Sequence, residues 1–155
     1  MRLDISKALK TPGQPLEFEL SERFEPICVA GEGIRFTQPV VVSGKAVFTG
    51  EDFFLRGSIR AEYIGTCCRC LKDVPSVMEI SFTEEFAKDS DENHPDRYLY
   101  QGEKLELGQM VGDLISLNAP MRHLCNDNCL GLCPVCGVDR NLADCGCPMP
   151  EPDGQ

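Results

Sequence analysis

Cysteines are the residues of this 155-residue chain whose number and spacing could support chemistry. The stretch CNDNCLGLCPVCG begins at Cys125 and contains four of the ten cysteines, and CGC follows at residues 145–147. Three more stand in CCRC, which begins at Cys67. Thiolates at such short spacings can form disulfides, perform redox chemistry or bind a metal ion. These three uses imply different functions.

Zinc is commonly held by four thiolates, and two cysteines separated by two residues can reach one ion from a tight turn. CPVCG at residues 133–137 and CCRC at residues 67–70 both contain such a pair. Cys28 and Cys68 are left as spare thiols. The remaining eight are predicted to be ligands of a structural zinc site with one or two ions: Cys67, Cys70, Cys125, Cys129, Cys133, Cys136, Cys145 and Cys147.

The eight cysteines allow two arrangements. In the first, the last four form one site in a small C-terminal ribbon, and the other four clamp the CCRC turn to the chain that leaves the predicted helix. In the second, a single ion takes two ligands from CCRC and two from the tail. His123 could replace a thiolate, although a solvent-exposed or capping histidine is the simpler interpretation. An iron–sulfur cluster is an alternative to zinc.

The other uses of cysteine fit the sequence less well. A disulfide scaffold requires export, and the N-terminal residues MRLDISKALK lack the apolar segment of a secretory signal, so we expect a cytoplasmic protein. Neither C-x-x-C pair opens a helix of a βαβ unit, as a thioredoxin-like site requires. A closed site of four thiolates leaves no position for a substrate, and no catalytic motif appears, so we predict that the protein is not an enzyme.

Charge and hydropathy limit the partners. The net charge is −10, and no two Lys or Arg residues are adjacent. This composition disfavours non-specific binding to RNA phosphates, and a basic protein is the better electrostatic partner. No stretch approaches the roughly 18 apolar residues that a membrane helix requires, so no membrane association is expected.

Alternating apolar residues predict an antiparallel sheet. Residues 15–20 form one predicted strand, residues 40–50 and 53–65 form a hairpin around Gly50-Glu51-Asp52, and residues 74–86 form a further strand. The CCRC turn lies between the last two strands. Residues 105–120 carry apolar side chains at helical spacing and end at a proline, so they predict a helix that packs on the sheet.

The rest of the chain has less regular patterns. The acidic segment at residues 87–104 predicts a solvated loop, in which His94 is given no role. From residue 121 onward no period remains. The predicted fold class is α+β: an antiparallel β-sheet, open or barrel-like, with one packed helix (residues 1–120), a cysteine-rich C-terminal zinc module (residues 121–147) and a flexible tail (residues 148–155).

Three segments, taken in order, resemble the YceD family, the large ribosomal RNA subunit accumulation proteins: CCRCL after a hairpin, LELGQMVGDLISLNAP, and LCNDNCLGLCPVCGVDRNLADCGC. The likeness covers residues 40–147. Cys67, Arg69 and Cys70 stand at the C-x-R-C turn of the family, whereas Cys68 is not part of the pattern. The six cysteines from Cys125 onward stand at a cysteine-rich tail that only part of the family has.

The resemblance implies a factor needed for accumulation of the 23S ribosomal RNA. We expect a non-enzymatic, zinc-stabilised platform that binds protein or RNA, with a ribosomal protein or an assembly intermediate as partner. Arg69, Arg122 and Arg140 lie among the cysteines and could contact ribosomal RNA phosphates. The alternatives are a thiol redox protein, an RNA-processing enzyme, and a zinc sensor or store, which would release its metal readily.

Overall fold

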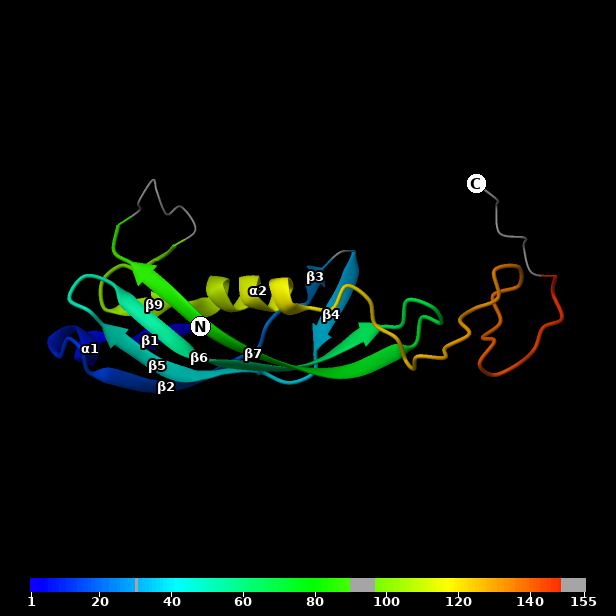
Figure 1. Cartoon of the computed structure of the whole chain (residues 1–155), viewed down its shortest axis with the longest axis horizontal. Helices are drawn as coiled ribbons and strands as arrows, with labels where there is room; N and C mark the ends of the chain where they lie inside the picture. The colour runs from blue at the N-terminus through cyan, green and yellow to red at the C-terminus, as the bar shows by residue number, and fades with distance from the viewer. Residues whose placement is uncertain (30, 90–96, 149–155) are drawn as a thin grey trace.

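The chain folds as a long, open antiparallel sheet with one main helix (Figure 1). The computed structural model describes residues 1–29, 31–89 and 97–148. Three long strands form the centre of the sheet: β5 (Val40–Phe48), β6 (Phe53–Thr66) and β7 (Asp73–Ala87).

The other elements are shorter. They are β1 (Arg2–Asp4), α1 (Ser6–Lys10), β2 (Pro15–Glu22), β3 (Ile27–Val29), β4 (Glu32–Phe36), β8 (Tyr98–Leu99), β9 (Lys104–Glu106) and α2 (Leu107–Asn118).

Strand β6 organises the sheet because it pairs along both edges. β7 follows the whole of one edge, while β5 and then β4 occupy successive parts of the other edge. β2 extends the sheet beyond β5, and β3 extends it beyond β4. Among the described strands, β2 pairs only with β5 and β8 only with β7, so the sheet is open. The barrel-like alternative is therefore wrong, because these outer strands do not meet.

The core lies between one face of the sheet and α2. Phe53, Leu55 and Ile59 of β6 are fully buried, whereas the alternate residues Arg56 and Arg60 are exposed, as expected for a sheet with one solvated face. Four residues of α2 enter the same core: Leu107, Met110, Val111 and Ile115.

Helix α2 depends on this packing. Gly108 and Gly112 each weaken a helix by about 1 kcal/mol relative to alanine, and its first turn has no side-chain cap. Each fully buried Leu, Ile, Val or Met side chain contributes about 1.5–3 kcal/mol, which outweighs that cost. The helix ends at Asn118, before Pro120, as predicted.

The predicted strands at residues 15–20, 40–50, 53–65 and 74–86 are confirmed. The solvated loop predicted at residues 87–104 is wrong in part: β8 lies within it, β9 begins at its last residue, and Tyr100 is buried. The Tyr100 hydroxyl donates to the carbonyl oxygen of Glu51 at 3.1 Å. The reason is that the Tyr98 and Tyr100 rings pack on the core residues Phe86 and Phe53.

His94 lies outside the described residues, as does the predicted flexible tail apart from Pro148. The predicted boundary between residues 120 and 121 stays a prediction.

The hairpin of β6 and β7 carries its turn beyond the packed body. Figure 1 shows the turn meeting the chain that follows α2, with the C-terminal segment at the end of the molecule opposite α1. We call residues 67–72 and 121–148 the cysteine lobe. Neither of the described helices is both long and apolar enough to cross a membrane.

Candidate metal centre

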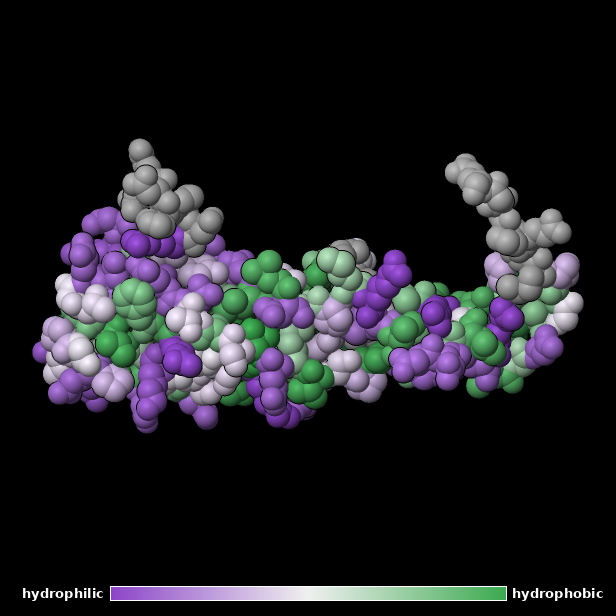
Figure 2. Space-filling view, in the orientation of Figure 1, coloured by the Kyte–Doolittle hydropathy of each residue, from purple (hydrophilic) through white to green (hydrophobic). Residues whose placement is uncertain are grey.

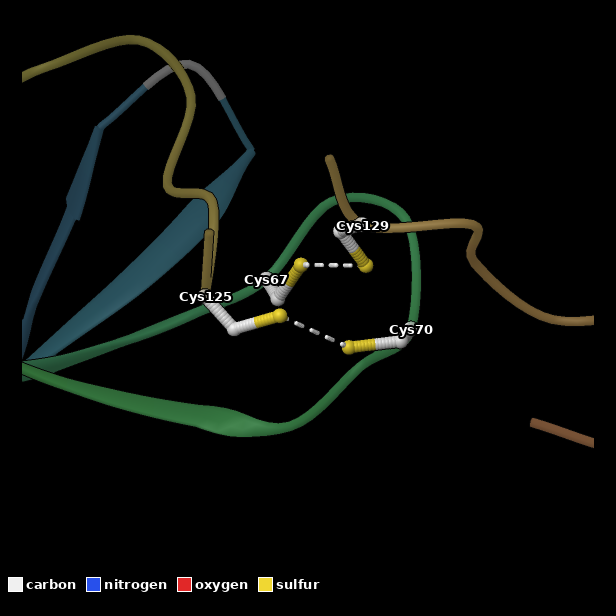
Figure 3. Close-up of side chains that lie close together, drawn as sticks. All are labelled: Cys67, Cys70, Cys125 and Cys129. Carbon is white, nitrogen blue, oxygen red and sulfur yellow. Dashed lines mark hydrogen bonds between the residues drawn. The ribbon is translucent and has the colours of Figure 1, made fainter. Parts of the chain in front are cut away.

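The hairpin turn brings two cysteines to two others from beyond α2. Cys67 and Cys70 lie in the turn, Cys125 and Cys129 follow α2, and the four side chains point toward one another (Figure 3). The four sulfurs all lie within 4.8 Å of one another. We call this group the first tetrad.

The spacing of these sulfurs suits one tetrahedral metal ion. Four sulfurs bonded to zinc at about 2.3 Å lie about 3.8 Å apart. The Sγ atoms of Cys67 and Cys129 are separated by 3.9 Å, and those of Cys70 and Cys125 by 3.5 Å. A disulfide requires about 2.05 Å, and all ten cysteines have free thiols.

A second tetrad forms from the last four cysteines. Their sulfurs also lie within 4.8 Å of one another: Cys133, Cys136, Cys145 and Cys147. The structure thus brings the eight predicted ligands together as two groups of four. Both groups could hold a metal ion by the chemistry of their donors, and ligation by these residues stays a prediction.

The two C-x-x-C turns have the same backbone hydrogen bonds. We call residues 67–72 the first knuckle and residues 133–138 the second. In the first, Leu71 N donates to Cys67 O at 2.9 Å and Cys67 N donates to Lys72 O at 2.8 Å. In the second, Gly137 N donates to Cys133 O and Cys133 N donates to Val138 O, both at 2.8 Å. The knuckles are therefore two copies of one local structure.

One position of the knuckle requires a left-handed backbone. The second knuckle has Gly137 there, with φ of 74°, and the first has Leu71, with φ of 60°. Leu71 is the only non-glycine residue with positive φ in the described parts of the chain. A side chain in this region costs roughly 1–2 kcal/mol. The first knuckle therefore retains a leucine at a conformational cost that the second avoids.

Backbone N–H groups favour the thiolate form of one cysteine in each knuckle. The N–H groups of Cys136 and Val135 point to the sulfur of Cys133 and lower its pKa to about 6. Burial acts in the opposite direction on Cys67, but the N–H groups of Cys70, Cys125 and Arg69 outweigh it and lower its pKa to about 6. Such N–H groups commonly stabilise metal-bound thiolates.

One thiol in each group resists ionisation because its neighbours are sulfurs. Cys129 and Cys70 raise the pKa of Cys125 to about 12, and Cys145 and Cys136 raise the pKa of Cys147 to about 12. Four thiolates at these distances need a cation to neutralise them. A bound metal ion would supply that charge.

Side-chain amides complete the surroundings of the first tetrad. Asn141 Nδ2 donates to Cys129 Sγ at 3.4 Å, and Asn126 Nδ2 donates to Cys125 Sγ at 3.5 Å. Asn141 Oδ1 also accepts from the backbone N–H of Leu130 at 2.8 Å. Asn141 thereby ties the segment that carries the second tetrad to the first tetrad.

Arg69 fixes the loop that precedes the second knuckle. Its Nη1 atom donates to the carbonyl oxygens of Cys129, at 2.9 Å, and Asp127, at 3.3 Å. Its own carbonyl oxygen accepts from Leu132 N at 2.9 Å. The Arg69 side chain, predicted as an RNA contact, thus has an internal structural use.

His123 is not solvent-exposed, contrary to the simpler expectation from the sequence. Its side chain is 5% exposed, and its Nε2 atom lies 3.4 Å from the Tyr63 hydroxyl. The ring lies against Gly65, because a Cβ at residue 65 would be 2.6 Å from it. His123 therefore supports the hairpin from behind the first tetrad and belongs to neither group of sulfurs.

The spare cysteines belong to neither tetrad. Cys28 is exposed in β3, and Cys68 is exposed in the first knuckle. Arg122 is exposed and Arg140 is half-buried. Sequence reasoning missed the roles of Lys72, Asp139 and Asn141, since nothing in their spacing relates them to cysteines far away in the sequence.

The comparisons with known proteins agree with the cysteine pattern. A family model described as the large ribosomal RNA subunit accumulation protein YceD matches residues 55–155, which include both tetrads and α2.

Two bacterial relatives, both described as uncharacterized proteins, cover most of the chain. Rv2926c of Mycobacterium tuberculosis is 28% identical over 148 residues, which is 89% of this chain and 70% of the relative. YlbN of Bacillus subtilis is 27% identical over 127 residues, which is 81% of this chain and 74% of the relative. No solved structure matches the chain at a significant level. Since the family model matches well over half of the chain, this protein belongs to the YceD family of large ribosomal RNA subunit accumulation proteins.

Proposed function

We propose that this protein is a non-enzymatic factor for accumulation of the 23S ribosomal RNA, and that its cysteine lobe is a zinc-stabilised platform for a protein of the assembling large subunit. The description of the family supports a connection with the large ribosomal subunit. The proposal of a zinc-stabilised platform rests on the two groups of four sulfurs in the cysteine lobe, beyond the end of the longest hairpin.

The geometry favours a structural use of the metal. When bound, zinc would cross-link backbone segments through four protein ligands, and no coordination position would remain for a substrate. The cysteine lobe needs such a link, because among the described apolar residues only Val74, Leu124 and Leu132 pack against the buried cysteines of the first tetrad. A structural zinc site contributes about 10–16 kcal/mol, far more than so small a cluster of apolar side chains.

Zinc is a better candidate than an iron–sulfur cluster for the group that each tetrad binds. The thiolates of a cluster bind different iron atoms and therefore lie further apart than the ligands of one ion. Each tetrad keeps its four sulfurs within 4.8 Å. This closeness supports one ion in each tetrad.

A protein is a better candidate than RNA for the main binding partner. The chain has a net charge of −10, which repels the phosphate backbone. Of the three arginines near the cysteines, Arg69 is bonded to backbone carbonyls. Arg122 and Arg140 remain for a local contact with ribosomal RNA beside the protein contact.

The test combines metal content with binding to ribosomal particles. We expect about two zinc ions per chain by elemental analysis, with only Cys28 and Cys68 open to thiol reagents before chelation. We also expect the zinc-loaded protein to co-sediment with precursors of the large subunit, and binding to fail after strong chelation. Metal-free protein with ten titratable thiols would instead favour the redox alternative, and metal lost to mild chelation would favour a zinc sensor or store.

A further inference from the structure

Large aliphatic side chains are exposed on the cysteine lobe. Leu71 is 65% exposed, Leu130 is 58%, Val135 is 62% and Leu142 is 77%. All four lie within or beside turns that carry cysteines, and Figure 2 shows hydrophobic residues among hydrophilic ones at this end of the molecule. Single exposed leucines are ordinary, but several on one small lobe indicate a surface that binds something.

A hydrogen bond and an ion pair link the turns that carry the exposed leucines. The backbone N–H of Leu130 donates to the side chain of Asn141, the residue before Leu142. Lys72, the residue after Leu71, forms an ion pair with Asp139 of the same segment. The exposed leucines therefore belong to connected turns of the lobe.

Leu71 differs from the others because its backbone conformation is unfavourable. The equivalent position of the second knuckle is Gly137, and the hydrogen bonds of the two turns match. Burial does not offset the cost, because Leu71 is mostly exposed and is not among the described apolar residues that pack on the first tetrad. A strained residue that contributes little to folding points to a use outside the folded chain.

We infer that Leu71 is an anchor that inserts into an apolar pocket of a basic protein when the cysteine lobe docks on its partner. This inference rests on the proposed function, since it identifies the contact that the proposed platform makes. The left-handed turn leaves the side chain mostly exposed to solvent. A rigid turn loses little further freedom on binding, which is an advantage for an anchor residue.

The chemistry of the surface favours a protein over RNA. Surfaces that bind unpaired bases usually stack them on aromatic rings. The first knuckle and residues 101–155 contain no Phe, Tyr or Trp. Aliphatic side chains instead suit an apolar pocket of a protein.

Charge indicates the kind of protein. The lobe has four basic side chains, Arg69, Lys72, Arg122 and Arg140, and three acidic ones, Asp127, Asp139 and Asp144. Each tetrad of thiolates around a divalent ion would add a net negative charge. The bound lobe is then acidic, as is the whole chain, and its complement is a basic protein surface.

The test uses full-length, zinc-loaded protein and purified precursors of the bacterial large ribosomal subunit. Leu71→Asn removes the leucine side chain with a residue that tolerates positive φ. Leu99→Asn makes the same change at a half-exposed residue that pairs with Ala87, at the other end of β7. We expect Leu71→Asn to weaken binding at least about tenfold and Leu99→Asn to change it less than about twofold. Zinc content must match the wild type in both variants.

A photoreactive benzoylphenylalanine in place of Leu71 identifies what the residue contacts. We expect a cross-link that protease removes and ribonuclease does not, and none when the same group replaces Leu99. A cross-link to RNA, a cross-link to a second copy of this chain, or wild-type binding by Leu71→Asn would each overturn the anchor. If the wild-type protein does not bind the particles, both the proposed function and the anchor are wrong. If the wild type and Leu71→Asn bind equally well, only the anchor is wrong.

Discussion

Lys72 Nζ lies 2.7 Å from Asp139 Oδ2, and this ion pair joins the first knuckle to the residue that follows the second. Asn141 holds Asp139 for this contact, because its backbone N–H and its side-chain amide both donate to Asp139 Oδ1. The two tetrads are therefore connected through side chains as well as through the chain between them.

We predict that Asp139→Asn loosens the second tetrad from the hairpin. The variant keeps all eight cysteines but loses the attraction to Lys72, so metal should leave a few-fold faster in the presence of a chelator. Release can be followed with a zinc-sensitive dye. Asp127→Asn is the matched control, because the Asp127 side chain has no ion-pair partner among the described residues and its removal should leave the rate unchanged.

The effect of Asp139→Asn should not depend on pH near neutrality. Lys72, together with the N–H groups of Asn141, lowers the pKa of Asp139 to about 2 from 3.8, so this carboxylate stabilises the fold above its unfolded pKa and stops doing so as pH falls through about 2. Asp139 raises the pKa of Lys72 above 10.5, so its contribution is lost only as pH rises beyond that value. The same difference in release rate is expected at about pH 6 and about pH 9. A difference that disappears within this range would contradict the pair.

We predict that each tetrad holds its own ion. Cys70→Ser and Cys136→Ser each remove one ligand from a different tetrad, so each should lower the metal content from about two ions per chain to about one. The loss of a site worth about 10–16 kcal/mol should also expose its remaining thiols to reagents. Elemental analysis with a thiol count measures both effects.

Cys28→Ser and Cys68→Ser are the controls, because both thiols are exposed and outside the tetrads. Both variants should retain the full metal content. A complete loss of metal in Cys136→Ser would mean that the sites are not independent, and a loss in Cys68→Ser would mean that the ligands are grouped differently.

Local patterns in the sequence were sufficient to predict the central hairpin and the helix. Alternation in β6 and the helical spacing of Leu107, Met110 and Val111 arise from burial on one face, which is visible in a single segment. β3 and β4 were missed because they are short and their burial depends on β6 and α2, which are distant in the sequence. The Tyr98 and Tyr100 rings were missed for the same reason.

The candidate site divides in the same way. The knuckles follow from C-x-x-C spacing, but the contacts of Arg69, Asn141 and His123 arise only after the hairpin meets the chain beyond α2. The sequence allowed one or two metal sites, and the structure places the sulfurs as two groups. Lys72 and Asp139 are charged residues of a kind that usually faces solvent, so nothing in the sequence indicated that they pair.

The buried His123 ring allows a prediction about Gly65. A Cβ at this position would lie 2.6 Å from the ring, and the ring cannot easily withdraw because the His123 carbonyl accepts from Cys68 N at 2.9 Å. Gly65→Ala should therefore lower the free energy of unfolding by about 1–3 kcal/mol and displace the first knuckle. Thermal unfolding and hydrogen exchange at the Cys68 amide measure the two consequences.

Gly112→Ala provides the comparison for Gly65→Ala. A Cβ at Gly112 has no atom within 4 Å, and the residue lies in the middle of α2. This variant should be more stable than the wild type by up to about 1 kcal/mol. If Gly65→Ala were equally harmless, the close packing of His123 against the hairpin would be incorrect.

The equivalence of Leu71 and Gly137 predicts opposite effects of exchanging their residue types. Leu71→Gly relieves about 1–2 kcal/mol of backbone strain in the folded state. The glycine also makes the unfolded chain more flexible, which lowers the stability by about 0.4–1 kcal/mol. The zinc-loaded variant should therefore be at least as stable as the wild type. Gly137→Leu meets no atom within 4 Å of its new Cβ, so its expected destabilisation is conformational and of about the same size as the strain. Denaturant unfolding at matched metal content compares the variants, and a large loss of stability in Leu71→Gly would mean that the leucine supports the fold and is not held for a partner.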